Sequence, residues 1–184
     1  MEAAVIDASV LFRGGIRDFL LWLAEAGAFS PIWSDMIHDE WMRNRRIKFD
    51  DPTVRLEWAR SEMERAFPGA NFAPDGRILT TLRLPDPADV HVVATAVAAE
   101  ARVIITYNDR DFPREVLDPL GVRAETPDLF CIHLENSRLV SEGARLHRAS
   151  LRNPPYGAGA YLEHLERQGL VQTVAILRAS PYPI

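Results

Sequence analysis

The chain has 184 residues, of which 47% are hydrophobic and 26% are charged, and these values fit one medium-sized soluble domain with a small appendage. Its formal net charge of −5 argues weakly against a nucleic-acid-binding protein, although a local basic patch matters more than the sum. The single cysteine, Cys131, excludes an internal disulfide and any zinc site made of several thiolates. We expect Cys131 to be a small buried side chain rather than a nucleophile.

The sequence carries no membrane or targeting signal. No run of about 18 apolar residues occurs, so we expect no membrane-spanning helix. The first residues, MEAAVIDASV, lack the basic region and cleavage site of a signal peptide, and we therefore expect a cytoplasmic protein. The five histidines show neither HExxH nor HxH spacing, so any metal ion should be held by oxygen ligands.

The N-terminal segment begins with a strand pattern and continues with a helix pattern. The apolar run at residues 3–6 shows no alternation, which is typical of a parallel strand covered on both faces, and Asp7 follows at its turn. Residues 14–26 have apolar side chains at helical spacing, and Gly27 is predicted to end that helix.

The next segment predicts a second strand and two further helices. The strand is expected within residues 29–34, where Ser34 is a suitable cap for a helix over residues 35–46. A longer helix pattern covers residues 53–67. Residues 69–84 are poorly patterned and predict a loop with at most one short element.

The clearest unit of the chain is LPDPADVHVVATAVAAEA with the strand pattern that follows it. Asp86 is predicted as a helix N-cap, Pro87 as the first helical residue and Asp89 as part of the first turn. The run RVIIT at residues 102–106 predicts a buried strand, and residues 108–112 form its exit loop.

The last third of the chain becomes increasingly helical. Residues 113–121 predict a short helix and residues 122–126 a last strand. The segments RLVSEGARLHRASL and GAYLEHLERQGLVQTVAILRAS are helical patterns separated by the turn RNPPYG. We therefore predict an α/β domain at residues 1–135, followed by a helical appendage at residues 136–184.

Acidic side chains and one amide gather near the ends of the predicted strands. Asp7 follows the first strand, and Asn108 and Asp111 follow the strand formed by RVIIT. In a parallel α/β sheet, ligands bind outside the carboxyl ends of the strands. Asp86 and Asp89 open the helix before that strand, and simple crossover geometry leaves open whether they reach the same edge. Each acidic residue also has a structural explanation, as a turn former, a helix cap or a complement to the helix dipole.

Four motifs, in order and at family-like spacing, resemble those of one nuclease family. They are VIDASVL near the N-terminus, WSDMIHDEWMRN, LPDPADVHVVATAV and VIITYNDRDFP. They look like the motifs of PIN-domain nucleases, in the branch close to VapC-type toxins of bacterial toxin–antitoxin pairs. The resemblance covers residues 3 to about 135. It implies a PIN-like, Rossmann-like three-layer α/β/α fold with a mainly parallel central sheet, followed by C-terminal helices, and it implies that the acidic residues meet in one pocket.

Carried over position by position, the resemblance assigns catalytic, metal-binding roles to Asp7, Glu40 and Asp89. The family's fourth acidic position falls on Asn108, where this sequence departs from the pattern because it carries an amide instead of a carboxylate. The resemblance still implies that Asn108 belongs to the metal site, through its carbonyl oxygen. Asp111 either supplies the missing charge as a further catalytic carboxylate or caps the turn that follows it.

Three more polar residues are predicted to support the metal ligands without contacting the metal themselves. Thr106 offers a hydroxyl that orients a ligand, and Asn44 lies one turn after Glu40 on the same helix face. Asp86 adds a carboxylate one turn before Asp89, where a supporting role and a capping role both stay open.

The predicted donor set suits Mg²⁺ or Mn²⁺, since both ions prefer oxygen ligands and usually keep several waters. Three carboxylates in close proximity repel one another without a cation and form a strong site with one. Such an ion activates water and neutralises the charge that builds on a phosphodiester during hydrolysis. Because Asn108 keeps a carbonyl oxygen but removes one negative charge, a second ion should bind more weakly than the first.

The stretch RNRRIK carries the signal for a polyanionic substrate. Arg43, Arg45, Arg46 and Lys48 crowd the end of the predicted helix that carries Glu40. Cations also favour a helix C-terminus for structural reasons alone. Beside a carboxylate pocket, however, a basic flank is what RNA phosphates need to approach, and we predict that these four residues contact RNA.

Together the residues and the resemblance predict a metal-dependent endoribonuclease, the toxin of a type II toxin–antitoxin pair. The implied partners are an RNA substrate, a cognate antitoxin protein and a second copy of the chain in a homodimer. The C-terminal helices either serve dimer or antitoxin contacts or pack on the sheet. A PIN-like protein that binds RNA or a partner without cutting is the alternative, and only Asn108 favours it. A phosphatase of the haloacid dehalogenase type is disfavoured, because Ser9 occupies the position of its second aspartate.

Overall fold

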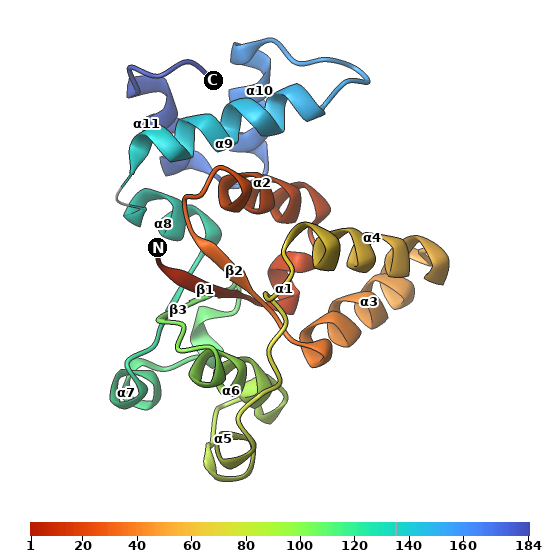
Figure 1. Cartoon of the computed structure of the whole chain (residues 1–184), viewed down its shortest axis with the longest axis vertical. Helices are drawn as coiled ribbons and strands as arrows, with labels where there is room; N and C mark the ends of the chain where they lie inside the picture. Colours follow the sequence, from red (N-terminus) through yellow and green to blue (C-terminus); the bar gives the residue numbers. More distant parts are fainter. Residues whose placement is uncertain (135) are drawn as a thin grey trace. The chain divides into compact units, whose positions relative to one another are not determined.

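The computed structural model describes residues 1–134 and 136–184 (Figure 1). Its strands form one parallel sheet in the order β2-β1-β3-β4. The strands are β1 (Ala3–Ile6), β2 (Ser30–Ile32), β3 (Val103–Ile105) and β4 (Arg123–Glu125). The α-helices are α1 (Ala8–Leu11), α2 (Gly14–Glu25), α3 (Asp35–Phe49), α4 (Thr53–Ala66), α5 (Gly76–Thr81), α6 (Val90–Ala98), α7 (Arg114–Leu117), α8 (Pro127–His133), α9 (Ser137–Ser150), α10 (Ala158–Arg167) and α11 (Val171–Ala179). The predicted α/β class, with a parallel sheet and C-terminal helices, is confirmed.

The described residues divide by their contacts into two compact units. The sheet unit consists of Glu2–Phe12 and Pro31–Glu125, and the helical unit consists of Met1, Arg13–Ser30 and Thr126–Ile184. Helix α2 thus belongs with the C-terminal helices, although it lies between two strands in sequence. The domain boundary predicted between residues 135 and 136 stays a prediction. Residue 135 itself lies outside the described residues.

The centre of the sheet unit is formed by β1 and β3, which lie between β2 and β4 and are buried except for Ala3. Neither strand carries a polar side chain. The two strands are parallel, with Ile6 opposite Ile105. The backbone N–H of Asp7 donates to the carbonyl oxygen of Ile105 at 3.0 Å, so the pairing continues past the end of β1. The residues that follow both strands are therefore held at one edge of the sheet.

Helix α3 begins after a side-chain cap and ends at a residue with a left-handed backbone. The Ser34 hydroxyl accepts a hydrogen bond from the N–H of Ile37, which is the predicted cap. The helix extends to Phe49, beyond the predicted residue 46, and Asp50 ends it with a left-handed backbone at φ 54°. Ile37 and Trp41 are fully buried on one face, as their spacing predicts.

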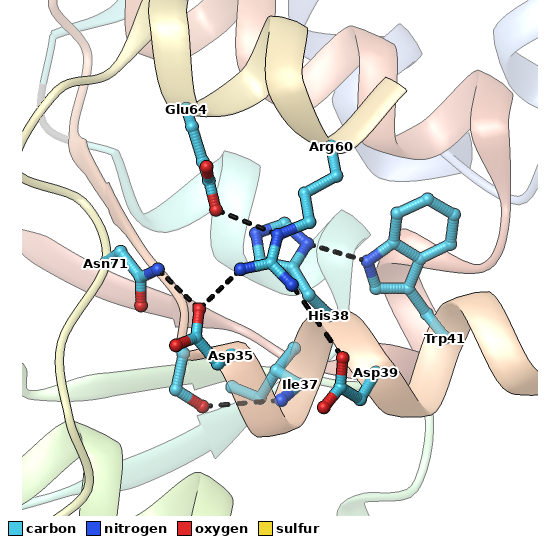
Figure 2. A network of polar contacts seen from close by, with 9 residues as sticks. Asp35, Ile37, His38, Asp39, Trp41, Arg60, Glu64 and Asn71 are labelled. Atoms are coloured by element: carbon cyan, nitrogen blue, oxygen red, sulfur yellow. Dashed lines mark hydrogen bonds and ion pairs between the residues drawn. The ribbon is translucent and has the colours of Figure 1, made fainter. Parts of the chain in front are cut away.

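A polar network connects α3 to α4 within the sheet unit, as Figure 2 shows. The Arg60 guanidinium of α4 contacts three carboxylates, those of Asp35, Asp39 and Glu64. The side-chain amide of Asn71 donates a further hydrogen bond to Asp35. This network fixes the first turn of the helix that carries Glu40.

The helical unit is held together by close helix packing and by one side-chain clamp. Gly143 of α9 faces α2 so closely that an added Cβ would lie 2.8 Å from the Cα of Leu23. The Asp128 carboxylate in α8 accepts hydrogen bonds from the N–H groups of Gln172 and Thr173 and from the Thr173 hydroxyl, at 3.0, 2.8 and 2.7 Å. These bonds satisfy the free amides at the start of α11.

Two features of the helical unit differ from the sequence prediction. Helix α8 is absent from the prediction, although Thr126 caps it and Pro127 occupies its first turn. The pattern expected to be one helix near residues 159–180 is two helices, because Gly169 adopts a left-handed backbone at φ 97°.

Cys131 is buried, and this burial raises the pKa of its thiol to about 12, in line with a structural role. Within the described residues, no helix is long and apolar enough to cross a membrane.

Candidate metal centre

Asp7 lies at the carboxyl end of β1 and is 2% exposed. Its Oδ2 accepts hydrogen bonds from the hydroxyls of Ser9, at 2.6 Å, and Thr106, at 2.7 Å. Burial raises the pKa of Asp7, while the Ser9 and Thr106 hydrogen bonds oppose that rise because they favour the ionised form. The Thr106 hydroxyl thus orients Asp7, and it also accepts from the N–H of Asn108 at 3.0 Å.

Asp89 lies in a 3-10 turn, Pro87–Asp89, which leads directly into α6. The Asp86 side chain accepts from the N–H of Ala88 at 2.8 Å, so its predicted capping role is present in the structure. Asp89 is 6% exposed, and its Oδ2 is buried without a hydrogen-bond partner in the described part of the chain. A buried carboxylate oxygen of this kind is costly unless something else satisfies it.

Burial, followed by the negative charges of Asp7, Asp86, Glu40 and Asp111, raises the pKa of Asp89 to about 7. The carboxylates that act on Asp89 therefore lie near it in the fold, although up to about a hundred residues separate them in the sequence. These charges lie close enough to Asp89 to affect its ionisation, which bears on the question of the sheet edge that the sequence leaves open. A helix that runs antiparallel to the strand after it begins at the carboxyl edge of that strand, so the start of α6 faces the same edge as Asp7.

Glu40 projects from α3 and is engaged with a residue that the sequence pattern does not mark. Its Oε2 lies 3.1 Å from Nε2 of His91, which is on α6 and 7% exposed. The other ring nitrogen of His91, Nδ1, is buried and has no partner among the described residues. No metal-binding spacing distinguishes His91 from the other histidines in the sequence. Sequence reasoning also misses Ser9 as a partner of Asp7, although a hydroxyl two residues after an aspartate is well placed to bond it.

The remaining predicted residues are Asp111, Asn108 and Asn44, and they are more exposed than Asp7 and Asp89. Asp111 is half-buried, contributes to the field at Asp89, and donates its N–H to the carbonyl oxygen of Asn108 at 2.9 Å. Asn108 is exposed and joins the network through its backbone. Asn44 lies exposed on α3. In the described residues, no three His, Cys, Asp or Glu side chains stand in a metal-binding arrangement. Asp7 accepts from Ser9, and Glu40 lies within hydrogen-bond distance of His91.

The basic residues at the end of α3 do not form one uniform patch. Arg45 forms an ion pair with Asp51 and donates to the carbonyl oxygen of Phe12 at 2.8 Å, which commits much of its hydrogen-bonding capacity to the protein. The Lys48 ammonium lies 5.6 Å from the centre of the Phe12 ring. Arg43 and Arg46 are exposed.

Residues 3–110 match the family model of the PIN domain, and the chain belongs to this family. Residues 127–179 match the model of the VapC50 C-terminal domain, so the chain has the two parts of a VapC-like PIN protein with a C-terminal extension. At the level of the family, these matches support a toxin-type nuclease, and PIN domains generally use divalent metal ions. Neither a curated protein nor a solved structure matches the chain significantly.

Proposed function

We propose that this protein is a metal-dependent endoribonuclease and the toxin of a type II toxin–antitoxin pair. One observation carries the proposal: Asp89 is a buried carboxylate with an unsatisfied oxygen in the described part of the chain, and it lies in the combined field of Asp7, Glu40 and Asp111. Such a concentration of negative charge destabilises a fold unless a cation binds, and it is characteristic of functional sites.

The residues fit Mg²⁺ or Mn²⁺. Asp7, Glu40 and Asp89 would hold the ion through carboxylate oxygens, which are the ligands both cations prefer. When bound, the ion supplies charge neutralisation and water activation for phosphodiester hydrolysis. Ser9 and Thr106 keep one oxygen of Asp7 fixed, and His91 holds Glu40, so the protein positions these ligands before substrate arrives.

The amide of Asn108 sets the expected number of ions. It leaves the pocket with one negative charge fewer than an aspartate would give, and Asp111 supplies a carboxylate three residues later. We expect one tightly bound ion, with a second that binds only when substrate phosphate contributes charge. Calorimetry with Mn²⁺ should therefore give one ion for the wild type and two for Asn108→Asp; two ions in the wild type would contradict the charge argument.

A non-catalytic PIN-like protein is the second candidate, and it rests on Asn108 together with the Glu40–His91 hydrogen bond, which occupies a predicted ligand. The RNA substrate and the antitoxin are suggested by the VapC resemblance, and a homodimer stays an expectation for the family. Arg43, Arg46 and Lys48 are the cations we expect to contact RNA phosphates at the end of α3, with a smaller contribution from Arg45.

Cleavage of a structured RNA by the purified chain tests the proposal. We expect cleavage with Mn²⁺ and none in excess EDTA, and we expect Asp7→Asn and Asp89→Asn to lower the rate by more than the roughly 10- to 100-fold typical of residues that merely support a ligand. Asp118→Asn is the matched control, because this aspartate is exposed and lies in a turn after α7. Cleavage that persists in EDTA or in both site variants would exclude the metal-dependent mechanism.

A further inference from the structure

The helical unit has a surface hollow of about 270 Å³ at the C-terminal end of α9. The hollow is lined by Arg148, Ala149, Leu151, Arg152, Pro155 and Tyr156. Two of these six residues are arginines and none is acidic. Because all six lie within nine consecutive residues of one unit, the site is complete within that unit.

The charge of this hollow differs from that of another hollow, on the sheet unit. That one has a volume of about 350 Å³ and is also lined by two arginines, Arg43 and Arg46, but Asp39 and Glu57 line it as well. Carboxylates in the lining offset the attraction of arginines for an anion. The hollow on α9 has no such offset and is the better place for a negatively charged ligand.

The two arginines are available for a ligand in different ways. Arg148 lines the hollow and is half-buried; its Nε is buried without a hydrogen-bond partner among the described residues, so a ligand would meet the terminal N–H groups of this guanidinium. Arg152 is exposed and forms none of the ion pairs found within the described part of the chain. Guanidinium groups bind phosphate oxygens through paired N–H donors, so both residues suit a phosphate.

Tyr156 adds an aromatic surface to the basic hollow. Its side chain is half-buried, and its ring centre lies 5.1 Å from that of His164, which supports it from α10. Nucleic-acid bases stack on aromatic rings of this kind with little regard to sequence. Phosphate-binding arginines next to such a ring match the repeating unit of a single strand, one phosphate and one base.

We propose that this hollow binds one nucleotide unit of single-stranded RNA, with the phosphate on Arg148 and Arg152 and the base on Tyr156. The inference rests on the proposed function, because it takes RNA as the substrate. The volume lies just below the roughly 300 to 1,000 Å³ of small-ligand pockets, which suits one unit of a longer strand. The C-terminal extension thereby gains an RNA-binding role of its own, separate from the carboxylate pocket.

Fluorescence anisotropy with a labelled single-stranded RNA tests the inference. The full chain is used with Asp7→Asn in EDTA, so that the RNA stays intact during the titration. We expect Tyr156→Leu to weaken binding about five-fold or more, and Tyr156→Phe to bind like the parent because it keeps the ring. Arg152→Glu should weaken binding and lower the slope of log K against log salt by about 0.7, the value for one phosphate on a single strand.

The matched control is Arg138→Glu, which makes the same charge change at an exposed position of α9 outside the hollow. If Arg138→Glu weakens binding as much as Arg152→Glu, the effect is one of overall charge and the inference is wrong. If Arg152→Glu alone acts and Tyr156→Leu binds like the parent, the hollow is an anion site that does not recognise RNA bases, which also overturns it.

The outcome is distinguishable from failure of the proposed ribonuclease activity. Weaker binding by the hollow variants, in a protein whose wild type cuts no RNA, would support the RNA site and overturn the nuclease. Unchanged binding by Arg152→Glu and Tyr156→Leu, in a protein whose wild type does cut RNA, would overturn the RNA site and leave the nuclease intact.

Discussion

The two units of this chain both bury ionisable side chains, but they respond to pH in opposite directions. In the sheet unit, burial and neighbouring negative charges raise the pKa of Asp89 to about 7. In the helical unit, burial lowers the pKa of His147 to about 4, and its Nδ1 lies 3.0 Å from the Tyr161 hydroxyl. Each interior disfavours charge, yet the carboxyl becomes charged as pH rises and the imidazole as pH falls. In the sheet unit, the carboxylates around Asp89 bring several like charges together, and a bound cation would relieve their repulsion.

The largest effect that would test this contrast is a fall in the free energy of unfolding of the metal-free protein as pH rises. The folded pKa of Asp89 lies above the ordinary 3.8, so its contribution to stability is complete below about pH 4 and is lost as pH rises to about 7. The loss is at most about 4 kcal/mol. Urea unfolding in EDTA at pH 5 and pH 8 measures the larger part of this loss, Asp89→Asn should reduce it, and Mn²⁺ should restore wild-type stability at pH 8. An equal pH dependence in wild type and Asp89→Asn would refute the assignment of this loss to Asp89.

A somewhat smaller effect of opposite sign is expected from His147. Its folded pKa lies below the ordinary 6.5, so its contribution is complete above pH 6.5 and is lost as pH falls to about 4, by at most about 3 kcal/mol. Unfolding curves between pH 7 and pH 4 in the Asp89→Asn background isolate this contribution. His147→Gln should flatten them, because a neutral amide still reaches Tyr161. If the curves keep their slope in His147→Gln, another group causes the acid sensitivity.

The smallest expected effect comes from a substitution in the helical unit that changes side-chain packing and leaves every charge in place. Gly143→Ala should destabilise the helical unit by about 1 to 3 kcal/mol, because the new Cβ would lie 2.7 Å from Cδ2 and 2.8 Å from Cα of Leu23. Gly159→Ala is the control: this glycine is also helical, nothing lies within 4 Å of its Cβ position, and alanine should stabilise the helix. Thermal unfolding compares the two variants, and equal shifts would mean that α2 and α9 do not approach each other this closely.

Much of the sheet unit could be predicted because its signals are local. The apolar runs that became β1 and β3, the Ser34 cap and the Asp86 cap all depend on neighbouring residues in sequence. Short-range rules of this kind describe the backbone before any tertiary contact is known.

The contacts that complete the candidate site could be predicted only in part, because they join distant parts of the chain. Thr106 is expected to orient a ligand, but the sequence does not pair it with Asp7, and no signal pairs Glu40 with His91. The hydrogen bond between Glu40 and His91 spans 51 positions, and the one between Thr106 and Asp7 spans 99. Nothing in the pattern around His91 distinguishes it from a core histidine. The helix end at Gly169 escapes prediction for a different reason: an amphipathic pattern continues across this glycine, and only its left-handed backbone shows that one helix ends there.

The Asp128 clamp has a practical consequence for dividing this chain into fragments. The carboxylate of Asp128 caps the first amides of α11, 44 and 45 positions away. A fragment that begins at residue 136, the boundary suggested by sequence, would lose this carboxylate and leave those amides without their partner. A separately expressed C-terminal piece should therefore begin before Pro127, and it would need the segment Arg13–Ser30 supplied in trans, since α2 covers α9. Reassembly of two such pieces would make the helical unit a split reporter for its own folding.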